Sequence, residues 1–199
     1  MKIIDITQPI SAGKQYYPTL PPPKIDLLRH YSMGHDHWVS SIQLPLHSAT
    51  HIDTPAHFSA DGETVERIPI EALISFAYVI DCSRKKVIKK EDLREKGVKF
   101  RALLFKTKND LENYTYFDVE AAKFIVENGV KIIGTESQSV DRFGDKTYPV
   151  HKIFSKQKIL IVEGLNLKEV DEGAYVFICI PLLLLNAEAA PARALLIQI

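Results

Sequence analysis

The chain has 199 residues, of which 46% are hydrophobic and 25% are charged, as in an ordinary globular protein with a substantial core. Its 25 basic and 25 acidic side chains give no net charge and no basic block, which argues against a nucleic-acid partner. The longest apolar run, near residues 180–185, is far shorter than the roughly 20 residues of a membrane span, and the first residues lack the apolar stretch of a signal peptide. We expect one cytoplasmic domain over residues 1–199 that is not attached to a membrane.

Short runs rich in β-branched and aromatic residues dominate the chain and predict strands. In chain order they cover residues 3–7, 39–46, 77–81, 102–106, 131–134, 158–162, 174–180 and 192–199. The three prolines at 21–23 predict an extended loop between the first two strands.

Helical patterns are fewer. Residues 90–96 predict a helix that ends at Gly97, and residues 118–128 predict a better one, with Asp118 as its cap. Two shorter helices are predicted at 139–143 and 150–155. Because a predicted helix is twice followed directly by a strand, we expect an α/β fold with a mixed β-sheet or barrel-like β core and flanking helices.

Residues 47–57, written HSATHIDTPAH, hold three of the seven histidines and one aspartate. His47, His51, Asp53 and His57 all occupy odd positions, which share one face in an extended strand, while the apolar Ile52 occupies the other. Imidazole and carboxylate are ligands of Zn²⁺ and its first-row neighbours. The pattern therefore predicts a metal site in this segment, in preference to a polar strand face without a metal.

The other candidates are weaker when each is taken alone. His35 and His37 flank Asp36, and they belong either to a ligand cluster or substrate loop near the site or to a solvated turn. His151 precedes a short apolar stretch, and Glu163 ends a predicted strand, where a carboxylate commonly faces a site because an unpaired buried charge is costly.

The motif and its surroundings resemble a known family. HSATHIDTPAH is similar to the H-x-G-T-H-x-D-x-P-x-H signature of the metal-dependent cyclase/hydrolase family that includes bacterial kynurenine formamidase. Further matches follow in order along the chain: DIT at residues 5–7, GTESQSVD at 134–141, EGL at 163–165, PL at 181–182 and APARA at 190–194. The main departure inside the motif is Ala49, which replaces the family's glycine and raises the question of an unusual backbone angle there.

The resemblance implies a role for each candidate residue. By this comparison, the first metal is bound by His47, His51 and Asp53, and Asp53 bridges to a second metal that His151 and Glu163 complete. The residue that matches the family's proton donor and acceptor is His57, and the one that matches its aromatic pocket lining is Tyr17. The expected cofactor is Zn²⁺, as one ion or two, with Mn²⁺ or Co²⁺ as alternatives.

The resemblance also implies a fold of the swivelling β/β/α type, a homodimer, and a small-molecule substrate. The expected activity is hydrolysis of an aryl formamide similar to N-formylkynurenine, as in tryptophan catabolism, by water that the metal activates. Two alternatives stay open: a hydrolase that opens a cyclic amide, and a non-catalytic metal- or ligand-binding protein of the same fold.

Overall fold

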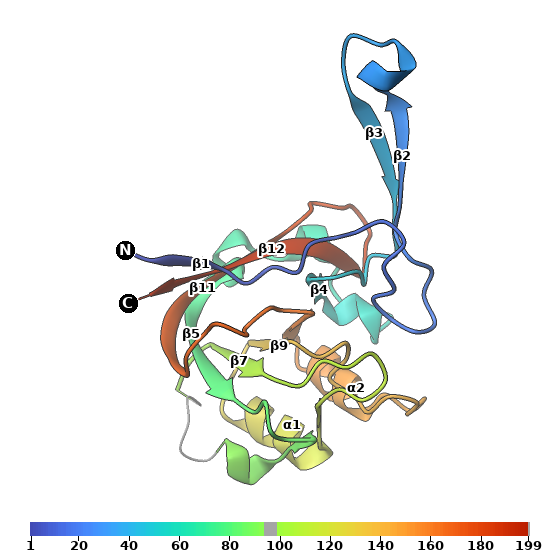
Figure 1. Cartoon of the computed structure of the whole chain (residues 1–199). Coiled ribbons are helices and arrows are strands. Elements are labelled where there is room, and N and C mark those ends of the chain that lie inside the picture. Colours follow the sequence, from blue (N-terminus) through green and yellow to red (C-terminus); the bar gives the residue numbers. More distant parts are fainter. Residues whose placement is uncertain (94–98, 199) are drawn as a thin grey trace.

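A closed ring of seven hydrogen-bonded strands forms the centre of the computed structural model, which describes residues 1–93 and 99–198 (Figure 1). The strand β4 closes the ring because it pairs with β10 on one side and with β12 on the other. An additional strand, β1 (Ile3–Asp5), pairs with β12 outside the ring. Around the ring the strands follow one another as β12 (Ala189–Gln198), β11 (Gly173–Pro181), β5 (Ile74–Asp81), β7 (Ala102–Lys106), β9 (Ile132–Thr135), β10 (Leu160–Glu163) and β4 (His51–Asp53).

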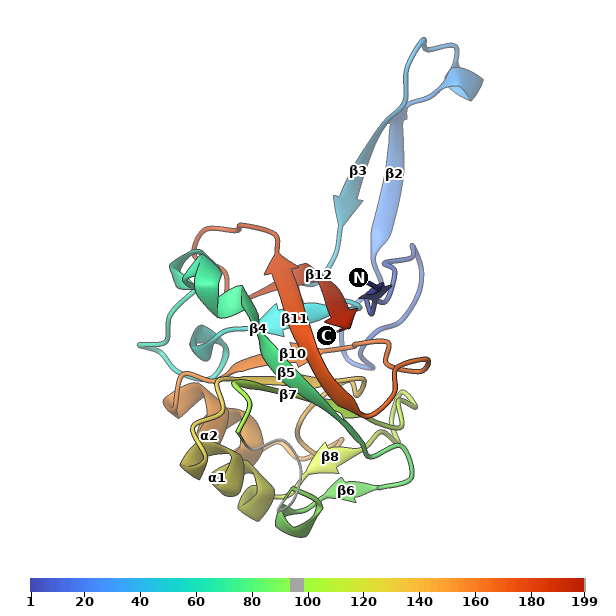
Figure 2. The same cartoon turned by 90° about the vertical axis from the view of Figure 1, so that its left-hand side faces the viewer.

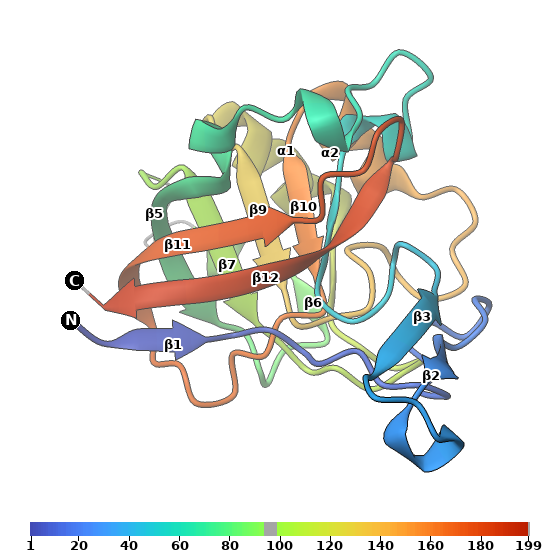
Figure 3. The same cartoon turned by 90° about the horizontal axis from the view of Figure 1, so that it is seen from above.

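The ring combines parallel and antiparallel pairs. The four strands β5, β7, β9 and β10 run parallel, and the remaining pairs of the ring are antiparallel. Seen from above, β11 and β12 cross over the parallel strands (Figure 3). Two helices, α1 (Val119–Glu127) and α2 (Pro149–Lys156), lie outside the parallel part (Figure 2). The predicted α/β class with a mixed, barrel-like β core and flanking helices is confirmed.

The parallel strands are buried on both faces, which explains their continuous apolar sequences. In β7, Leu104 packs inside the ring with Val162, whereas Leu103 and Phe105 belong to the cluster beneath the helices. Phe154 of α2 belongs to that second cluster. The site-bearing strands therefore rest on a core that packs from two sides.

Helix α1 follows from local sequence signals. The carboxylate of Asp118 accepts a hydrogen bond from the Ala121 N–H at 2.7 Å, which caps the first turn. Gly129, with a φ of 73°, follows its last turn. The helices predicted at 118–128 and 150–155 are confirmed as α1 and α2.

Short elements connect the larger ones. The strands β6 (Val87–Ile88) and β8 (Tyr116–Phe117) form a parallel pair. Within the two described ranges the 3-10 helices are η1 (Tyr31–Met33), η2 (Pro55–His57), η3 (Val65–Arg67), η4 (Ile70–Leu73) and η5 (Lys90–Asp92).

A two-stranded hairpin projects from the ring (Figures 1 and 2). Residues 24–43, here named the hairpin arm, contain β2 (Lys24–Arg29) and β3 (Val39–Gln43), and every residue of these two strands is exposed. His35 and His37 are exposed in its turn, where His37 contacts Asp36. Of the two alternatives for His35 and His37, the structure therefore shows the solvated turn. Both residues lie outside the histidine cluster described below.

Several predicted boundaries differ from the structure. The strand expected at 39–46 ends at Gln43, and the helix expected at 139–143 is wrong. That segment is held in an irregular conformation, because the Phe117 N–H donates to the Val140 carbonyl and the Val140 N–H donates to Glu163. Of the helix expected at 90–96, only the 3-10 turn η5 falls within the described residues, and residues 94–96 lie outside them.

Candidate metal centre

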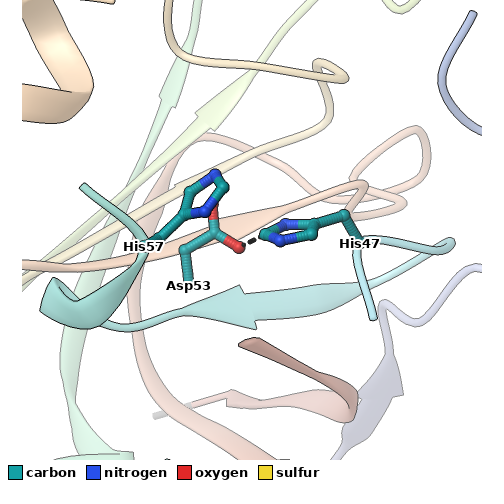
Figure 4. A group of neighbouring side chains, drawn as sticks. All are labelled: His47, Asp53 and His57. Atoms are coloured by element: carbon teal, nitrogen blue, oxygen red, sulfur yellow. Dashed lines mark ion pairs between the residues drawn. The ribbon is translucent and has the colours of Figure 1, made fainter. Parts of the chain in front are cut away.

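Residues 47–57, the predicted metal-binding segment, contain β4, the strand that closes the ring. Only His51–Asp53 forms a strand, so the extended segment expected at 47–57 is shorter than predicted. His47 lies in the loop before β4, and His57 ends η2, where Pro55 is the first residue. Figure 4 shows the imidazoles of His47 and His57 approaching the carboxylate of Asp53 from different directions.

The alternation predicted for this segment holds within β4. Ile52 is 1% exposed and packs into the cluster inside the ring. His51 and Asp53 point to the opposite face, where His51 pairs in register with Glu163 of β10. Helix α2, which carries His151, contacts both β10 and η2 on this side.

Four of the predicted residues converge around the carboxylate of a fifth, Asp53. Its Oδ1 lies 2.9 Å from His47 Nδ1 and 3.3 Å from His51 Nε2, while its Oδ2 lies 3.7 Å from His151 Nε2. Glu163 is 3.6 Å from His51 Nε2 through Oε2 and 3.5 Å from His151 Nε2 through Oε1. These side chains come from two separate parts of the sequence, residues 47–53 and 151–163, and the pairing of β4 with β10 brings His51 and Asp53 beside Glu163.

Several of these atoms are buried without a hydrogen-bond partner. Among the described residues they include His51 Nε2 and both carboxylate oxygens of Asp53. Buried polar atoms are normally hydrogen-bonded, so unpaired ones at a shared centre indicate a site for a bound partner. A divalent cation fits this donor set of imidazole nitrogens and carboxylate oxygens. By proximity, ligand atoms lie within 4.8 Å of one another in two groups: His47, Asp53 and His57, and His51, Asp53 and Glu163.

A surrounding layer of hydrogen bonds orients the inner side chains. His51 Nδ1 donates to the Ala49 carbonyl at 3.1 Å, which turns Nε2 toward the centre. Glu163 Oε1 accepts from the Val140 N–H at 3.0 Å. His47 Nε2 lies 3.2 Å from Glu188 Oε1, so both ring nitrogens of this histidine face carboxylates.

The electrostatics divide the histidines into two kinds. Burial lowers the pKa of His47, but the Asp53 carboxylate outweighs it and raises the pKa to about 9. Burial lowers the pKa of His57 to about 4, because neighbouring histidines oppose the attraction of Asp53. For His151, the neighbouring carboxylates of Asp141, Asp53 and Glu163 outweigh burial and raise the pKa. His57 is therefore neutral at pH 7, whereas His47 and His151 hold protons that a metal must displace.

The backbone beside the site is tightly packed. Ala49 has a φ of 56°, which answers the question raised by the family's glycine: the position does adopt a left-handed conformation. Gly164, which follows Glu163, has a φ of 66°, and a Cβ there would lie 2.2 Å from the Ala49 carbonyl oxygen. The two segments that carry His51 and Glu163 thus touch through backbone atoms.

A pocket of about 180 Å³ opens over the cluster. Tyr17 lies in its wall together with Leu20, Phe58 and Tyr148, and His57 faces the same space. Burial raises the pKa of Tyr17, so its phenol stays neutral. The pocket is smaller than the roughly 300–1,000 Å³ of sites for drug-sized ligands, which favours a small substrate.

Sequence analysis missed several residues of the site. Asp141 was noted only as part of a family match, although it contacts His151, and no role in the site was predicted for Glu188, Phe58 or Tyr148. The position of Phe58 directly after His57 was the one available signal. Nothing in the sequence around Tyr148 or Glu188 distinguishes them from surface residues.

Comparison with known proteins identifies the family. The Cyclase family model matches residues 4–142. The chain belongs to this family. A curated protein named kynurenine formamidase from Bacillus anthracis is 30% identical over 98% of the chain and 97% of its own length. The residues that the Cyclase family model matches include His47, His51, Asp53 and His57.

Solved structures share the fold of this cyclase-family chain. One described as a potential metal-dependent hydrolase with cyclase activity has a TM-score of 0.86 and 31% identity, over 98% of this chain and 96% of that one. Isatin hydrolase A from Labrenzia aggregata has a TM-score of 0.83 at 19% identity, over 98% and 93% of the two chains, which shows the shared fold alone. Within the described residues, no helix has the length and apolar character needed to cross a membrane.

Proposed function

We propose that this chain is a metal-dependent hydrolase that cleaves the C–N bond of a small aryl formamide. One observation carries the proposal: His51 Nε2 and the oxygens of Asp53 are buried without hydrogen-bond partners, beside residues that line a pocket with aromatic rings in its wall. Membership of the cyclase family and similarity to a protein named kynurenine formamidase support the same activity.

The proposed metal ligands are the five residues that meet at the cluster. The two oxygens of Asp53 face different partners, since Oδ1 lies beside His47 and His51, and Oδ2 lies beside His151. This division supports an arrangement in which His47, His51 and Asp53 would hold one ion, and Asp53, His151 and Glu163 would hold a second. Zn²⁺ is the proposed ion because imidazole and carboxylate suit it, and Mn²⁺ and Co²⁺ are the alternatives.

When bound, a divalent ion supplies a Lewis acid for the amide carbonyl and lowers the pKa of water. His57 is neutral at pH 7 and faces the pocket, so its imidazole is free to accept the proton of the attacking water. The same group then delivers that proton to the leaving nitrogen. One C–O bond forms and the C–N bond breaks, so one water and one formamide give formate and an aryl amine.

The test of this function measures formate release. Protein freed of metal and then loaded with Zn²⁺, Mn²⁺ or Co²⁺ is offered aryl formamides and a cyclic aryl amide. We expect formate from the formamides only with the metal-loaded protein. Ring opening of the cyclic amide without formate release would favour the alternative hydrolase. Stoichiometric metal without turnover of either substrate would favour a binding protein.

We further propose that the chain forms a homodimer through the hairpin arm. The arm exposes apolar side chains that include Leu28 and Trp38, which are 55% and 62% exposed. The loop after β11 rises on the same side of the ring and exposes Leu183 and Leu185 at 77% and 74% (Figures 1 and 2). Exposed apolar surfaces of this kind mark interaction sites, and a second copy offers each surface the other as partner.

A further inference from the structure

A buried hydroxyl close to the pocket has no part in the metal cluster. Tyr114 is 1% exposed, and its Oη has no hydrogen-bond partner among the described residues. A buried hydroxyl is normally paired, because leaving it without a partner costs the hydration that it loses. The Tyr114 hydroxyl is therefore a candidate for a role that is completed only when something binds.

The position of Tyr114 is fixed by the loop that carries it, between β7 and β8. The Thr115 N–H donates to the Lys108 carbonyl at 3.0 Å, and Lys86 Nζ donates to the Tyr114 carbonyl at 3.2 Å. The ring of Phe143 packs against that of Tyr114, with centroids 6.5 Å apart and an interplanar angle of 78°. Because the backbone is held and the ring is buried, the hydroxyl has little freedom to turn away and find water.

The Tyr114 hydroxyl lies directly behind the pocket wall. Tyr17 and Ser139, which both line the pocket, and the carboxylate of Glu163 are close enough to influence the pKa of the Tyr114 phenol. Tyr17 comes from the amino-terminal loop, where the Leu20 N–H donates to the Tyr17 carbonyl at 3.1 Å and closes a turn. Two loops that are far apart in the sequence therefore bring two phenols together, one in the wall and one behind it.

These hydroxyls can act as a chain of donors. Burial raises the pKa of Tyr114 as well as that of Tyr17, so both phenols keep their protons at pH 7. Ser139 Oγ accepts from the Asp141 N–H at 3.3 Å, which leaves the proton of Ser139 for the Tyr114 oxygen. The Tyr114 O–H is then left for the oxygen of Tyr17. A Tyr17 oxygen that accepts from behind the wall directs its own proton into the pocket.

We propose that the Tyr17 hydroxyl donates to a second oxygen acceptor on the substrate, apart from the amide that is cleaved, and that Tyr114 is the positioning residue that directs this hydroxyl. The acceptor is a carbonyl or carboxylate oxygen attached to the aryl ring. This inference rests on the proposed function and narrows its substrate class. Hydrogen bonds in unliganded sites are often long and tighten on binding. A bound acceptor therefore aligns the two phenols and gives the Tyr114 hydroxyl the partner that it lacks.

The experiment compares matched substrates on the metal-loaded full chain. N-(2-acetylphenyl)formamide carries a carbonyl acceptor, whereas N-(2-isopropenylphenyl)formamide has nearly the same shape with a CH₂ group in place of that oxygen. The corresponding 3-substituted pair tests a second position on the ring. Because a ketone also makes the amine a better leaving group, the ratio of the two kcat/KM values is compared between the wild type and Tyr17→Phe. We expect the ratio to fall by at least about tenfold in the variant for one of the pairs. An unchanged ratio for both pairs would overturn the proposal while leaving the proposed hydrolase intact.

A double-mutant cycle tests the positioning role of Tyr114. Tyr114→Phe should lower the same ratio by about threefold or more, mainly through KM, at wild-type metal content. In the Tyr17→Phe background it should cause no further change in the ratio, because the hydroxyl that it directs is gone. Tyr116→Phe removes a phenol oxygen that does not line the pocket and should keep the wild-type ratio. A Tyr114→Phe protein with the wild-type ratio, or with an equal loss in both backgrounds, would contradict the positioning role.

Binding provides a measurement that needs no turnover. Calorimetry on the metal-loaded protein compares N-(2-acetylphenyl)acetamide with its 2-isopropenyl analogue, and the 3-substituted pair likewise. Tighter binding of the ketone, lost in Tyr17→Phe, supports the proposal even if no formamide is cleaved, an outcome that would count against the proposed function alone. Ketones that bind no better than their isopropenyl analogues contradict the proposal in either case.

Discussion

The Nδ1 atom of His151 lies 2.6 Å from Oδ2 of Asp141, and this contact turns Nε2 of the same ring toward Asp53 and Glu163. Asp141 also accepts from the N–H of Val150 at 2.8 Å and from that of His151 at 3.1 Å, at the start of α2. One carboxylate therefore fixes both the helix and the orientation of its histidine.

Replacing Asp141 with asparagine should lower metal affinity by about 10–100-fold, because an amide no longer selects the His151 tautomer that leaves Nε2 unprotonated. The oxygen of asparagine still caps α2, so circular dichroism and thermal stability should change little. Competition with a chelating dye measures the affinity. Wild-type affinity in a folded variant would remove Asp141 from the support of the site.

His57→Asn should keep metal content at the wild-type level and reduce kcat by on the order of 10²–10⁴-fold, as expected for loss of a general acid–base group. Metal analysis and formate release are measured on the same sample. The side chain of His57 also groups by proximity with His47 and Asp53. Loss of metal from this variant would make His57 a ligand instead.

Metal affinity should rise with pH up to about pH 9, where His47 loses its proton. Metal binding requires neutral imidazole, and each displaced proton contributes up to roughly tenfold in affinity per pH unit. The folding stability of the metal-free protein should instead fall as the pH rises. Because the folded pKa of His47 is raised, its ion pair with Asp53 stabilises the fold fully below about pH 6.5 and is lost as pH rises through about 9. Calorimetric titrations and melting curves at pH 6.5, 7.5 and 8.5 measure the two trends, and a pH-independent affinity would contradict the first.

Gly164→Ala should destabilise the protein by about 1–3 kcal/mol or more, since it adds left-handed strain and a methyl group against the Ala49 carbonyl. The matched control is Ala49→Gly, in which relief of a similar strain offsets the greater chain entropy of glycine, so the change should stay within about 1 kcal/mol. Denaturant unfolding of the metal-free proteins measures both. A Gly164→Ala variant as stable as the control would show that the two segments separate easily.

The double substitution Leu28→Asp and Trp38→Asp should convert a dimer to a monomer, because it places charges on the apolar surface of the hairpin arm. Light scattering after size exclusion gives the mass. Ile70→Asp, at an apolar position that is 57% exposed outside the arm, is the control and should leave the mass unchanged. A wild-type chain that is monomeric at micromolar concentration would contradict the proposed interface.

The sequence predicts which segments form strands of the ring better than it predicts where each strand begins and ends. The strand at 102–106 is located to the residue because Leu103, Leu104 and Phe105 form a run buried on two faces. The strand β2 was missed, since its alternating pattern faces solvent on both sides and no core fixes it. The failure at 139–143 has a tertiary cause: Phe117, distant in sequence, donates to the Val140 carbonyl that a helix would have used.

For the candidate site, ligand chemistry and spacing within 47–57 brought four side chains to attention. Their convergence with His151 and Glu163 followed from resemblance, because no local pattern encodes the pairing of β4 with β10. Asp141 and Tyr148 stayed without a role for the same reason. Asp141 matters because it contacts Nδ1 of His151, and Tyr148 matters because it contacts the ring of Phe58. Only the folded chain brings these pairs together.

The strand that closes the ring is also its shortest, with three residues held between β10 and β12. Two of those three residues are His51 and Asp53. The cylinder cannot open between β4 and β10 without separating His51 from Glu163, its partner in register. Local unfolding of the seam and dismantling of the histidine–carboxylate cluster are therefore a single event, and amide hydrogen exchange in β4 would report both at once.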